Sequence, residues 1–315
     1  MSKLLAVLCT RRRHGNTATL LKEAMAGAQT VEGVEVEPLY LHSSSFGPCR
    51  SSFWCIRHGG VGCCLDDDFG RKGEGEIFKQ VTQANGIIVA DPVQFWGPSA
   101  TAHLFFERLY PFHWSDLLNG IPFGSITCAT NQGFQLYSTR EICKWAFTMK
   151  MRYIESVSAH TAQWEQHIQA ARELGVAVAR ASLDDARQRV KFTEQDVYAY
   201  YLDKPWRVYE PYFENMTDGK YTYEDSLIGR ALAEGSFKRP EAIDLLQKAG
   251  TEFKQALASY LEHNQEAASQ HLIKAADFWT NATWKEFLEE TVIKAPQPEA
   301  YRSLKQYEHE ESPDV

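Results

Sequence analysis

Residues 1–184 alternate short strand-like runs with amphipathic helical stretches. Residues 3–9 are apolar over almost their whole length, which is typical of a strand buried on both faces of a parallel sheet. Further strand-like runs lie at 34–41, 86–90, 123–130 and 154–159, and helical periodicities at 18–29, after 67–68, 99–109, 139–149 and 162–181. This alternation predicts an α/β fold with a flavodoxin-like, doubly wound, five-stranded parallel sheet.

The pattern changes beyond about residue 185, where no strand-like run is evident. Two long helical periodicities, 242–262 and 265–291, follow each other after a very short break, which predicts an antiparallel helical hairpin. We therefore expect two domains, a flavodoxin-like domain over residues 1–184 and an all-helical C-terminal extension over residues 185–315. Aromatic residues between 198 and 213 are expected either to pack on the sheet domain or to form a lid over its ligand.

The chain carries a net charge of −8, which disfavours a broad surface for nucleic acid or anionic membranes. It enters a strand directly and has no apolar run long enough to span a bilayer, so we expect a cytoplasmic protein with reduced thiols. Under reducing conditions, seven cysteines indicate thiol, metal or cluster chemistry wherever they bunch. The isolated Cys9, Cys128 and Cys143 are expected to be core thiols.

Residues 10–17 form a polar, basic loop between the first strand and the first helix. A helix N-terminus in this position favours an anion through its unpaired N–H groups and its dipole. Arg12 or Arg13 can neutralise the anion's charge, and Gly15 allows close backbone approach. The alternative is an ordinary strand–helix turn with solvated arginines.

Four cysteines bunch between the second strand and the second helix: Cys49, Cys55, Cys63 and Cys64. The acidic run 66–68 that follows them is expected to cap the second helix. Glu107 and Arg108, further along, are expected to form a solvated or dimer-face ion pair. His113 and Trp114 are expected to contact a substrate or to act as packing anchors.

Two more loops complete a family pattern: residues 91–100 follow the third strand, and residues 130–133 follow the fourth. With the first loop and the cysteine segment, they resemble the NADPH-dependent FMN reductase family and, within it, the iron–sulfur flavoproteins. The resemblance covers about residues 1–160. It implies FMN as cofactor and NADPH or NADH as electron donor.

In that family a Ser-Pro-Arg-x-x-Gly-Asn-Thr loop holds the flavin phosphate. Here Thr10 stands for the serine, Arg12 for the arginine and Thr17 for the final threonine, whereas Arg11 replaces the proline. The other two loops would line the flavin ring, with backbone N–H groups of residues 95–97 near its pyrimidine end. The resemblance thus assigns FMN to Thr10, Arg12, Gly15, Asn16, Thr17, Pro92, Val93, Gln94, Phe95, Trp96, Gly97, Asn131, Gln132 and Gly133.

The family's cysteine pattern, Cys-x2-Cys-x2-Cys with a later fourth cysteine, is altered here. Ser52 occupies the second position, and Cys64 is an additional cysteine next to Cys63. A [4Fe–4S] cluster requires four thiolates, which Cys49, Cys55, Cys63 and Cys64 could supply. The alternatives are a vestigial loop without a cluster and a metal held by the first three of these cysteines with His58.

The resemblance implies transfer of electrons from NAD(P)H to a small organic acceptor such as a quinone, a nitro or azo compound or a flavin. It also implies a homodimer or homotetramer. No catalytic side chain stands out in the sequence, and flavin chemistry does not require one. Two alternatives remain: an electron-transfer flavoprotein that serves a protein partner, with or without a cluster, and a flavin-free scaffold, which the change to Arg11 would favour.

Overall fold

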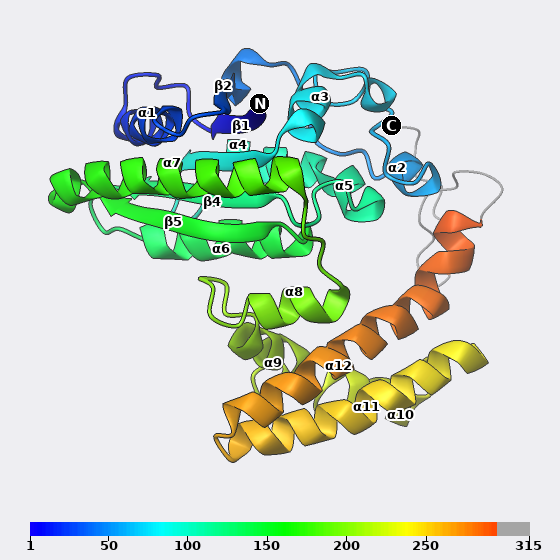
Figure 1. Cartoon of the computed structure of the whole chain (residues 1–315). Helices are drawn as coiled ribbons and strands as arrows, with labels where there is room; N and C mark the ends of the chain where they lie inside the picture. Colours follow the sequence, from blue (N-terminus) through cyan, green and yellow to red (C-terminus); the bar gives the residue numbers. More distant parts are fainter. Residues whose placement is uncertain (295–315) are drawn as a thin grey trace.

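The computed structural model describes residues 1–294 and contains one five-stranded, all-parallel sheet with strand order β2-β1-β3-β4-β5. This confirms the predicted flavodoxin-like architecture (Figure 1). The strands are β1 (Ser2–Leu8), β2 (Val34–Tyr40), β3 (Gly86–Pro92), β4 (Pro122–Ala129) and β5 (Arg152–His160). Because β1, β3 and β4 are covered on both faces, they read as continuous apolar runs in the sequence.

Helices cover the sheet on both faces, as the alternating pattern predicts. Helices α1 (Asn16–Gln29) and α7 (Trp164–Arg187) enclose one hydrophobic core with β1, β3 and β4. Helices α3 (Glu76–Gln83), α4 (Ala100–Arg108) and α6 (Gln135–Thr148) enclose the other. Short elements complete this part of the chain: η1 (Leu41–Ser43), α2 (Trp54–Arg57), η2 (Arg71–Gly73), α5 (Tyr110–Ser115) and η3 (Thr161–Gln163).

The extension is all-helical over its described residues and contains α8 (Glu194–Tyr200), α9 (Tyr209–Thr217), α10 (Leu227–Glu234), α11 (Pro240–Leu261), α12 (Gln265–Thr283) and the π-helix η4 (Trp284–Ile293). Helices α11 and α12 pack together as the predicted hairpin and share a core with α9 and α10. The division into two domains at residue 184 stays a prediction. The last residues of the predicted extension, 295–315, lie outside the described chain.

The aromatic stretch 198–213 packs against the sheet domain. The Tyr201 hydroxyl donates to the Met151 carbonyl at 2.7 Å, and the Tyr200 hydroxyl donates to the Tyr153 carbonyl at 2.7 Å. Tyr153 lies at the start of β5 and Met151 directly before it. A ligand in this fold binds at the opposite edge of the sheet, beyond the carboxyl ends of the strands. For these two residues the packing alternative is therefore correct.

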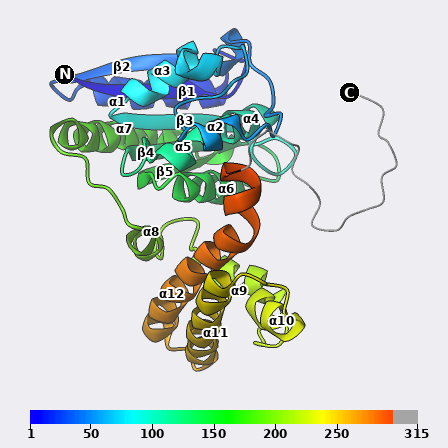
Figure 2. The same cartoon turned by 90° about the vertical axis from the view of Figure 1, so that its right-hand side faces the viewer.

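The end of the extension returns to the sheet domain. In Figures 1 and 2 the segment coloured red, η4, rises from the helical hairpin towards α2 and α5. There Trp284 packs against Trp114, with ring centroids 4.9 Å apart. Trp114 is therefore a packing anchor, and the neighbouring His113 places its Nδ1 2.9 Å from the Thr148 carbonyl oxygen. Within residues 1–294, no helix is both long and apolar enough to cross a membrane.

Helices α1 and α7 touch through their backbones at two glycines. A Cβ atom on Gly175 would lie 1.8 Å from the Ala24 carbonyl oxygen, and one on Gly27 would lie 2.1 Å from the Arg172 carbonyl oxygen. Only a residue without a side chain allows this approach. The two glycines thereby set the distance between the helices on this face of the sheet.

We expect Gly175→Ala to lower the free energy of unfolding by at least about 1–3 kcal/mol, because the helices must separate to admit the methyl group. Gly47→Ala is the matched control, since a Cβ there would meet nothing within 4 Å. Urea unfolding followed by circular dichroism measures both. Equal stability of the two variants would show that α1 and α7 do not touch at Gly175.

Candidate functional site

Two adjoining cavities lie beyond the carboxyl ends of β1, β3 and β4. The first, of about 370 Å³, and the second, of about 190 Å³, share Val93, Ala129 and Thr130 in their linings. The first cavity is also lined by Thr10, Arg12, Gly15, Asn16, Thr17, Pro92 and Gln94, and the second by Phe95, Trp96, Asn131, Gln132 and Gly133. The structure thus brings the predicted cofactor-binding residues together, except that Gly97 lies beside the cavities without lining them.

The first loop presents the unsatisfied N-terminus of α1 to the first cavity. Gly15 precedes the helix, and no side chain among residues 1–294 caps it. Arg12 makes no ion pair with the described residues and lines the cavity. By contrast, Arg13 donates to Ser43 Oγ at 2.6 Å and lies over the Tyr40 ring. The geometry therefore favours Arg12 over Arg13 as the cation for an anion bound here.

The loop after β3 is a tight turn with two aromatic residues at its tip. The amide and carbonyl groups of Gln94 and Gly97 pair reciprocally, at 2.9 and 3.1 Å. Phe95 and Trp96 between them have φ angles of +52° and +69°. Such angles match a type I′ turn, which usually selects Asn-Gly. For bulky side chains the conformation costs about 1–3 kcal/mol each and is typical of functional loops.

This turn leaves specific backbone donors available. The Gly97 N–H already donates to the Gln94 carbonyl, so it is committed within the turn. The N–H groups of Phe95 and Trp96 donate no hydrogen bond inside the described chain. They are therefore the two members of the predicted 95–97 donor set that remain available to a ligand.

The loop after β4 supports the turn through Trp96. The Trp96 Nε1 donates to Gln132 Oε1 at 3.1 Å, and its ring stacks on Phe134 with centroids 5.0 Å apart. Asn131 and Phe134 have positive φ angles of +57° and +67°. The two loops thus hold each other in place, although Phe95 is fully exposed and Trp96 is 62% exposed.

A buried carboxylate ties the ends of the β3 loop together. Asp91, the penultimate residue of β3, is fully buried and accepts the Ser99 backbone N–H at 2.9 Å and the Ser99 hydroxyl at 2.5 Å. Ser99 in turn caps α4 by accepting the Ala102 N–H. Burial raises the pKa of Asp91 to about 7, although the hydrogen bonds from Ser99 lower it.

Cys128 and Ala129 also line the first cavity, although the sequence pattern did not predict them there. Cys9, Cys128 and Cys143 are buried, as expected. The Cys128 thiol, however, contacts the Thr17 hydroxyl, so it also joins the first loop to β4, while burial raises its pKa. Its position three residues before Asn131 was the available signal.

Three of the four bunched cysteines line a third cavity, of about 250 Å³, which shares no lining residue with the first two. Cys49, Cys55 and Cys63 line it together with Ser52. Within residues 1–294, no three ligating side chains converge on a single-ion site. His58 instead stacks on Trp54 and places its Nδ1 2.7 Å from the Trp54 carbonyl oxygen. The alternative of one metal ion on three cysteines and His58 therefore finds no geometric support.

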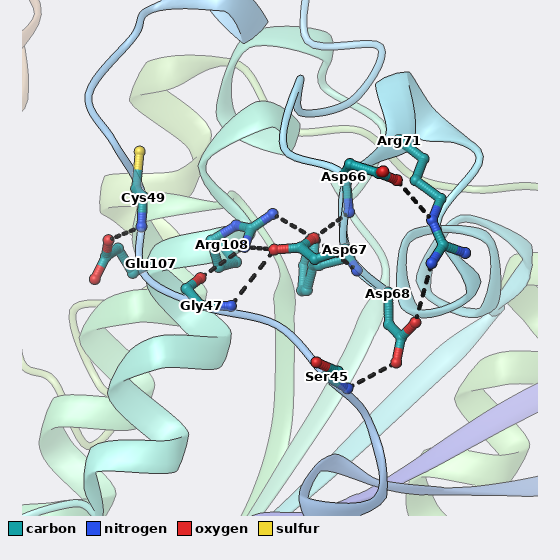
Figure 3. Close-up of polar contacts among 11 residues, drawn as sticks. Ser45, Gly47, Cys49, Asp66, Asp67, Asp68, Arg71, Glu107 and Arg108 are labelled. Carbon is teal, nitrogen blue, oxygen red and sulfur yellow. Dashed lines mark hydrogen bonds and ion pairs between the residues drawn. The ribbon is translucent and has the colours of Figure 1, made fainter.

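A buried ion pair anchors the cysteine loop (Figure 3). Arg108 is almost fully buried and bonds both carboxylate oxygens of Asp67, at 2.6 and 3.0 Å. It also donates to the Gly47 carbonyl at 2.6 Å. Burial raises the pKa of Asp67, but the Arg108 guanidinium lowers it further and holds it below its usual range. Removing one partner would leave the other charge buried and uncompensated.

Two expectations about these charges are wrong. Residues 66–68 do not cap the following helix, since α3 begins at Glu76 after an uncapped Gly75 in the described structure. Glu107 and Arg108 do not pair with each other, because Glu107 accepts the Cys49 N–H at 2.6 Å and Arg108 bonds Asp67. Both side chains hold the cysteine loop, a partnership between segments about 40 to 60 residues apart that no local pattern reveals.

A family model described as NADPH-dependent FMN reductase matches residues 2–166, just over half of the chain. The chain belongs to this family.

Two curated relatives are iron–sulfur flavoproteins. The one from Methanocaldococcus jannaschii is 33% identical over 109 residues, covering 35% of this chain and 52% of the relative. The one from Archaeoglobus fulgidus is 26% identical over 131 residues, covering 42% of this chain and 56% of the relative. The match thus spans about half the length of these relatives.

Solved structures similar to this chain include a flavone reductase and a WrbA-like flavodoxin from Agrobacterium tumefaciens. The flavone reductase has a TM-score of 0.45 at 15% identity, over 60% of this chain and 66% of its own. The WrbA-like protein has a TM-score of 0.39 at 16% identity, over 60% of this chain and 100% of its own.

The raised pKa of Asp91 predicts a pH dependence of stability. The usual pKa of this carboxyl group is 3.8, and in the folded protein it is about 7. The protonated Asp91 therefore stabilises the folded protein fully below pH 3.8, and this contribution is lost as the pH rises through about 7. Asp91→Asn removes this dependence while keeping an acceptor for Ser99. We therefore expect the variant to gain stability relative to the native chain as the pH rises from 5 to 8, because about two pH units of the window between 3.8 and 7 lie in that range.

Midpoints of urea unfolding at the two pH values measure this difference. Asp203→Asn, at a carboxyl group whose side chain is 80% exposed, is the control and is expected to show no such change. A constant difference between Asp91→Asn and the native chain would mean that Asp91 stays charged throughout.

Proposed function

We propose that this chain uses FMN to pass electrons from NADPH or NADH to a small organic acceptor, such as a quinone, a nitro or azo compound or a free flavin. The observation that carries the proposal is the pair of adjoining cavities. They are built from the loops after β1, β3 and β4, and one has the unsatisfied N-terminus of α1 at its wall. This is where open α/β sheets bind ligands.

The phosphate end of FMN fits the first cavity. The N–H groups in the first turn of α1 supply donors and a positive dipole end, and Arg12 supplies a full positive charge. The Thr10 Oγ1 accepts the Arg12 backbone N–H at 3.3 Å and stabilises the loop in this shape. An anion is thus matched by cationic and dipolar groups that the described chain leaves unpaired.

The ring end fits the second cavity. The Phe95 and Trp96 N–H groups are available to carbonyl oxygens of a flavin, and donors in this position stabilise a developing negative charge. When bound, FMN supplies the hydride acceptor and the one- or two-electron donor. The protein orients the ring through a turn that Asp91 and Trp96 hold in place.

The rim of the second cavity supports a flat, aromatic acceptor. Phe95, Trp96, Phe134 and Tyr137 are all exposed there, and the ring of Tyr137 lies near Gly97. Aromatic side chains held in fixed orientations present stacking surfaces at a small entropic cost.

The homodimer or homotetramer stays a prediction, which light scattering would check.

A second candidate function is electron transfer to a protein partner through FMN and an iron–sulfur cluster. It is favoured by the cavity that Cys49, Cys55 and Cys63 share. Both curated relatives are named iron–sulfur flavoproteins. This function predicts slow turnover with small acceptors and a cluster in the purified protein.

We expect Arg12→Ala to weaken FMN binding about 10- to 150-fold, because it removes a charge-assisted hydrogen bond to the phosphate. Arg13→Ala is the matched control, since that side chain is engaged with Ser43 and Tyr40. Titration of the flavin-free protein with FMN, followed by flavin fluorescence, gives both affinities. Equal affinities of the two variants would place the phosphate elsewhere.

We expect the purified protein to carry flavin absorbance, which excess NADPH or NADH bleaches under anaerobic conditions. Addition of a quinone should restore the absorbance within one turnover. A flavin that neither nicotinamide reduces would argue for the electron-transfer function. A colourless protein that takes up no added FMN would instead favour the flavin-free scaffold.

A further inference from the structure

A fourth cavity, of about 400 Å³, lies between the sheet domain and the extension. Its lining joins α6, the edge strand β5 and the segment 203–207, which links α8 to α9 on the α6 side of the sheet (Figure 1). Its volume is within the range of small-molecule sites in proteins. The family match ends at residue 166, so one wall of this cavity comes from a part of the chain that the family model does not include.

The fourth cavity begins beside the ring end of the candidate flavin site. Leu136, in the first turn of α6, lines the fourth cavity, and Gly133, three residues earlier, lines the second. Tyr137, next to Leu136, lies near Gly97 at the rim of the second cavity. Because consecutive Cα atoms are about 3.8 Å apart, the two cavities flank the same short segment. A ligand with its reactive ring in the second cavity can therefore extend over the first turn of α6 into the fourth.

Three cationic side chains line the fourth cavity. Arg140 follows Leu136 by one turn of α6, and Lys204 and Arg207 come from the extension. Both arginines are exposed, and neither forms an ion pair with a described residue. Their guanidinium groups are thus available to a ligand.

The two carboxylates in the lining are engaged locally. Asp203 pairs with the adjacent Lys204 at 3.4 Å, and Glu155 accepts the Ser156 backbone N–H at 2.9 Å. The charge left for a ligand is therefore that of the two arginines, in a chain whose net charge is −8. Two guanidinium groups favour an anion, and their planar donor geometry suits phosphate.

The wall that the extension supplies is fixed against α6. The Trp206 N–H donates to Cys143 Sγ, and the Lys144 Nζ lies 5.5 Å from the centre of the Trp206 ring. The Arg207 N–H donates to the Lys204 carbonyl at 2.8 Å, in a turn where Arg207 has a φ angle of +45°. The cations on the two sides of the cavity therefore keep their places relative to each other.

We propose that this cavity binds the phosphate-bearing half of the nicotinamide donor. Arg140 and Arg207 contact its phosphates, and the apolar side chains of Leu136, Ile154 and Pro205 contact its adenosine. The proposal rests on the proposed function, because it assigns the part of NADPH or NADH that lies outside the ring cavity. Since the cations of the first cavity serve the FMN phosphate in that function, the phosphates of the donor need a second set. The extension then takes part in donor binding.

The test uses the full chain loaded with FMN. Calorimetric titration with NADP⁺ and NAD⁺, which do not reduce the flavin, gives binding affinities. Stopped-flow reduction by NADPH and NADH separates the dissociation constant of the donor from the rate at saturation. Arg140→Ala and Arg207→Ala should each weaken donor binding about 3- to 10-fold, as expected for charge-assisted hydrogen bonds at an exposed site, and leave the rate at saturation nearly unchanged.

The two donors identify the phosphate that is bound. A loss of affinity confined to NADPH and NADP⁺ would assign the arginines to the 2′-phosphate, and an equal loss with all four nucleotides would assign them to the shared diphosphate. Either result supports the proposal. Raising the ionic strength should weaken donor binding more in the native chain than in the variant with both alanines, because salt screens exposed charges.

Arg180→Ala is the matched control. Arg180 is an exposed arginine on α7, which covers the other face of the sheet, so its loss should leave donor binding unchanged. The FMN affinity of Arg140→Ala and Arg207→Ala should equal that of the native chain, in contrast to Arg12→Ala. Circular dichroism checks that each variant is folded.

Three outcomes would overturn the proposal. Unchanged affinity for both donors in the variant with both alanines would place the phosphates elsewhere and leave the FMN-dependent function intact. An equal loss of affinity in Arg180→Ala would make the effect one of overall charge. A native chain whose bound FMN neither nicotinamide reduces would remove the proposed function itself, and the donor site with it.

Discussion

The parallel alignment of the five strands is the constraint on which the site depends. Because all strands run the same way, the loops after β1, β3 and β4 emerge at one edge of the sheet, although they are about 80 and 40 residues apart in the sequence. The order β2-β1-β3-β4-β5 then places these three loops side by side. The first loop contributes a helix N-terminus and Arg12, and the other two contribute backbone N–H groups and aromatic rings. A cavity for an elongated, anionic, partly aromatic ligand follows from this alignment.

The loops that line the cavities are shaped by contacts that oppose their local preferences. Two consecutive aromatic residues in left-handed conformations would not persist in a free peptide. Here the turn is closed by two backbone hydrogen bonds, its base is clamped by Asp91 and Ser99, and Trp96 is held by Gln132 and Phe134. A buried carboxyl group, a stack of rings and a strained turn thus form one unit. Its rigidity suits a role in orienting a bound ring.

The cysteine loop is organised separately, around Arg108. This buried guanidinium joins α4 to Asp67, to the backbone at Gly47 and to the Cys63 thiol. The extension adds a second support, because η4 packs Trp284 and Leu288 on the same loop. The end of the extension therefore packs on a segment that lies more than 200 residues earlier in the sequence. None of its aromatic residues from 198 to 213 lines either of the first two cavities in the described structure.

The sequence by itself determined the α/β class, the helical hairpin and most residues of the candidate flavin site. These depend on local signals, namely apolar runs, helical periodicity and polar loops that follow strands, which are read within a few residues of each other. Only the tertiary structure decided that Arg12 is unpaired while Arg13 is engaged, and that Asp67 and Glu107 hold the cysteine loop. It alone brought Cys64 to Ser52. Such partnerships depend on how distant segments meet in space, and composition and spacing carry no record of that.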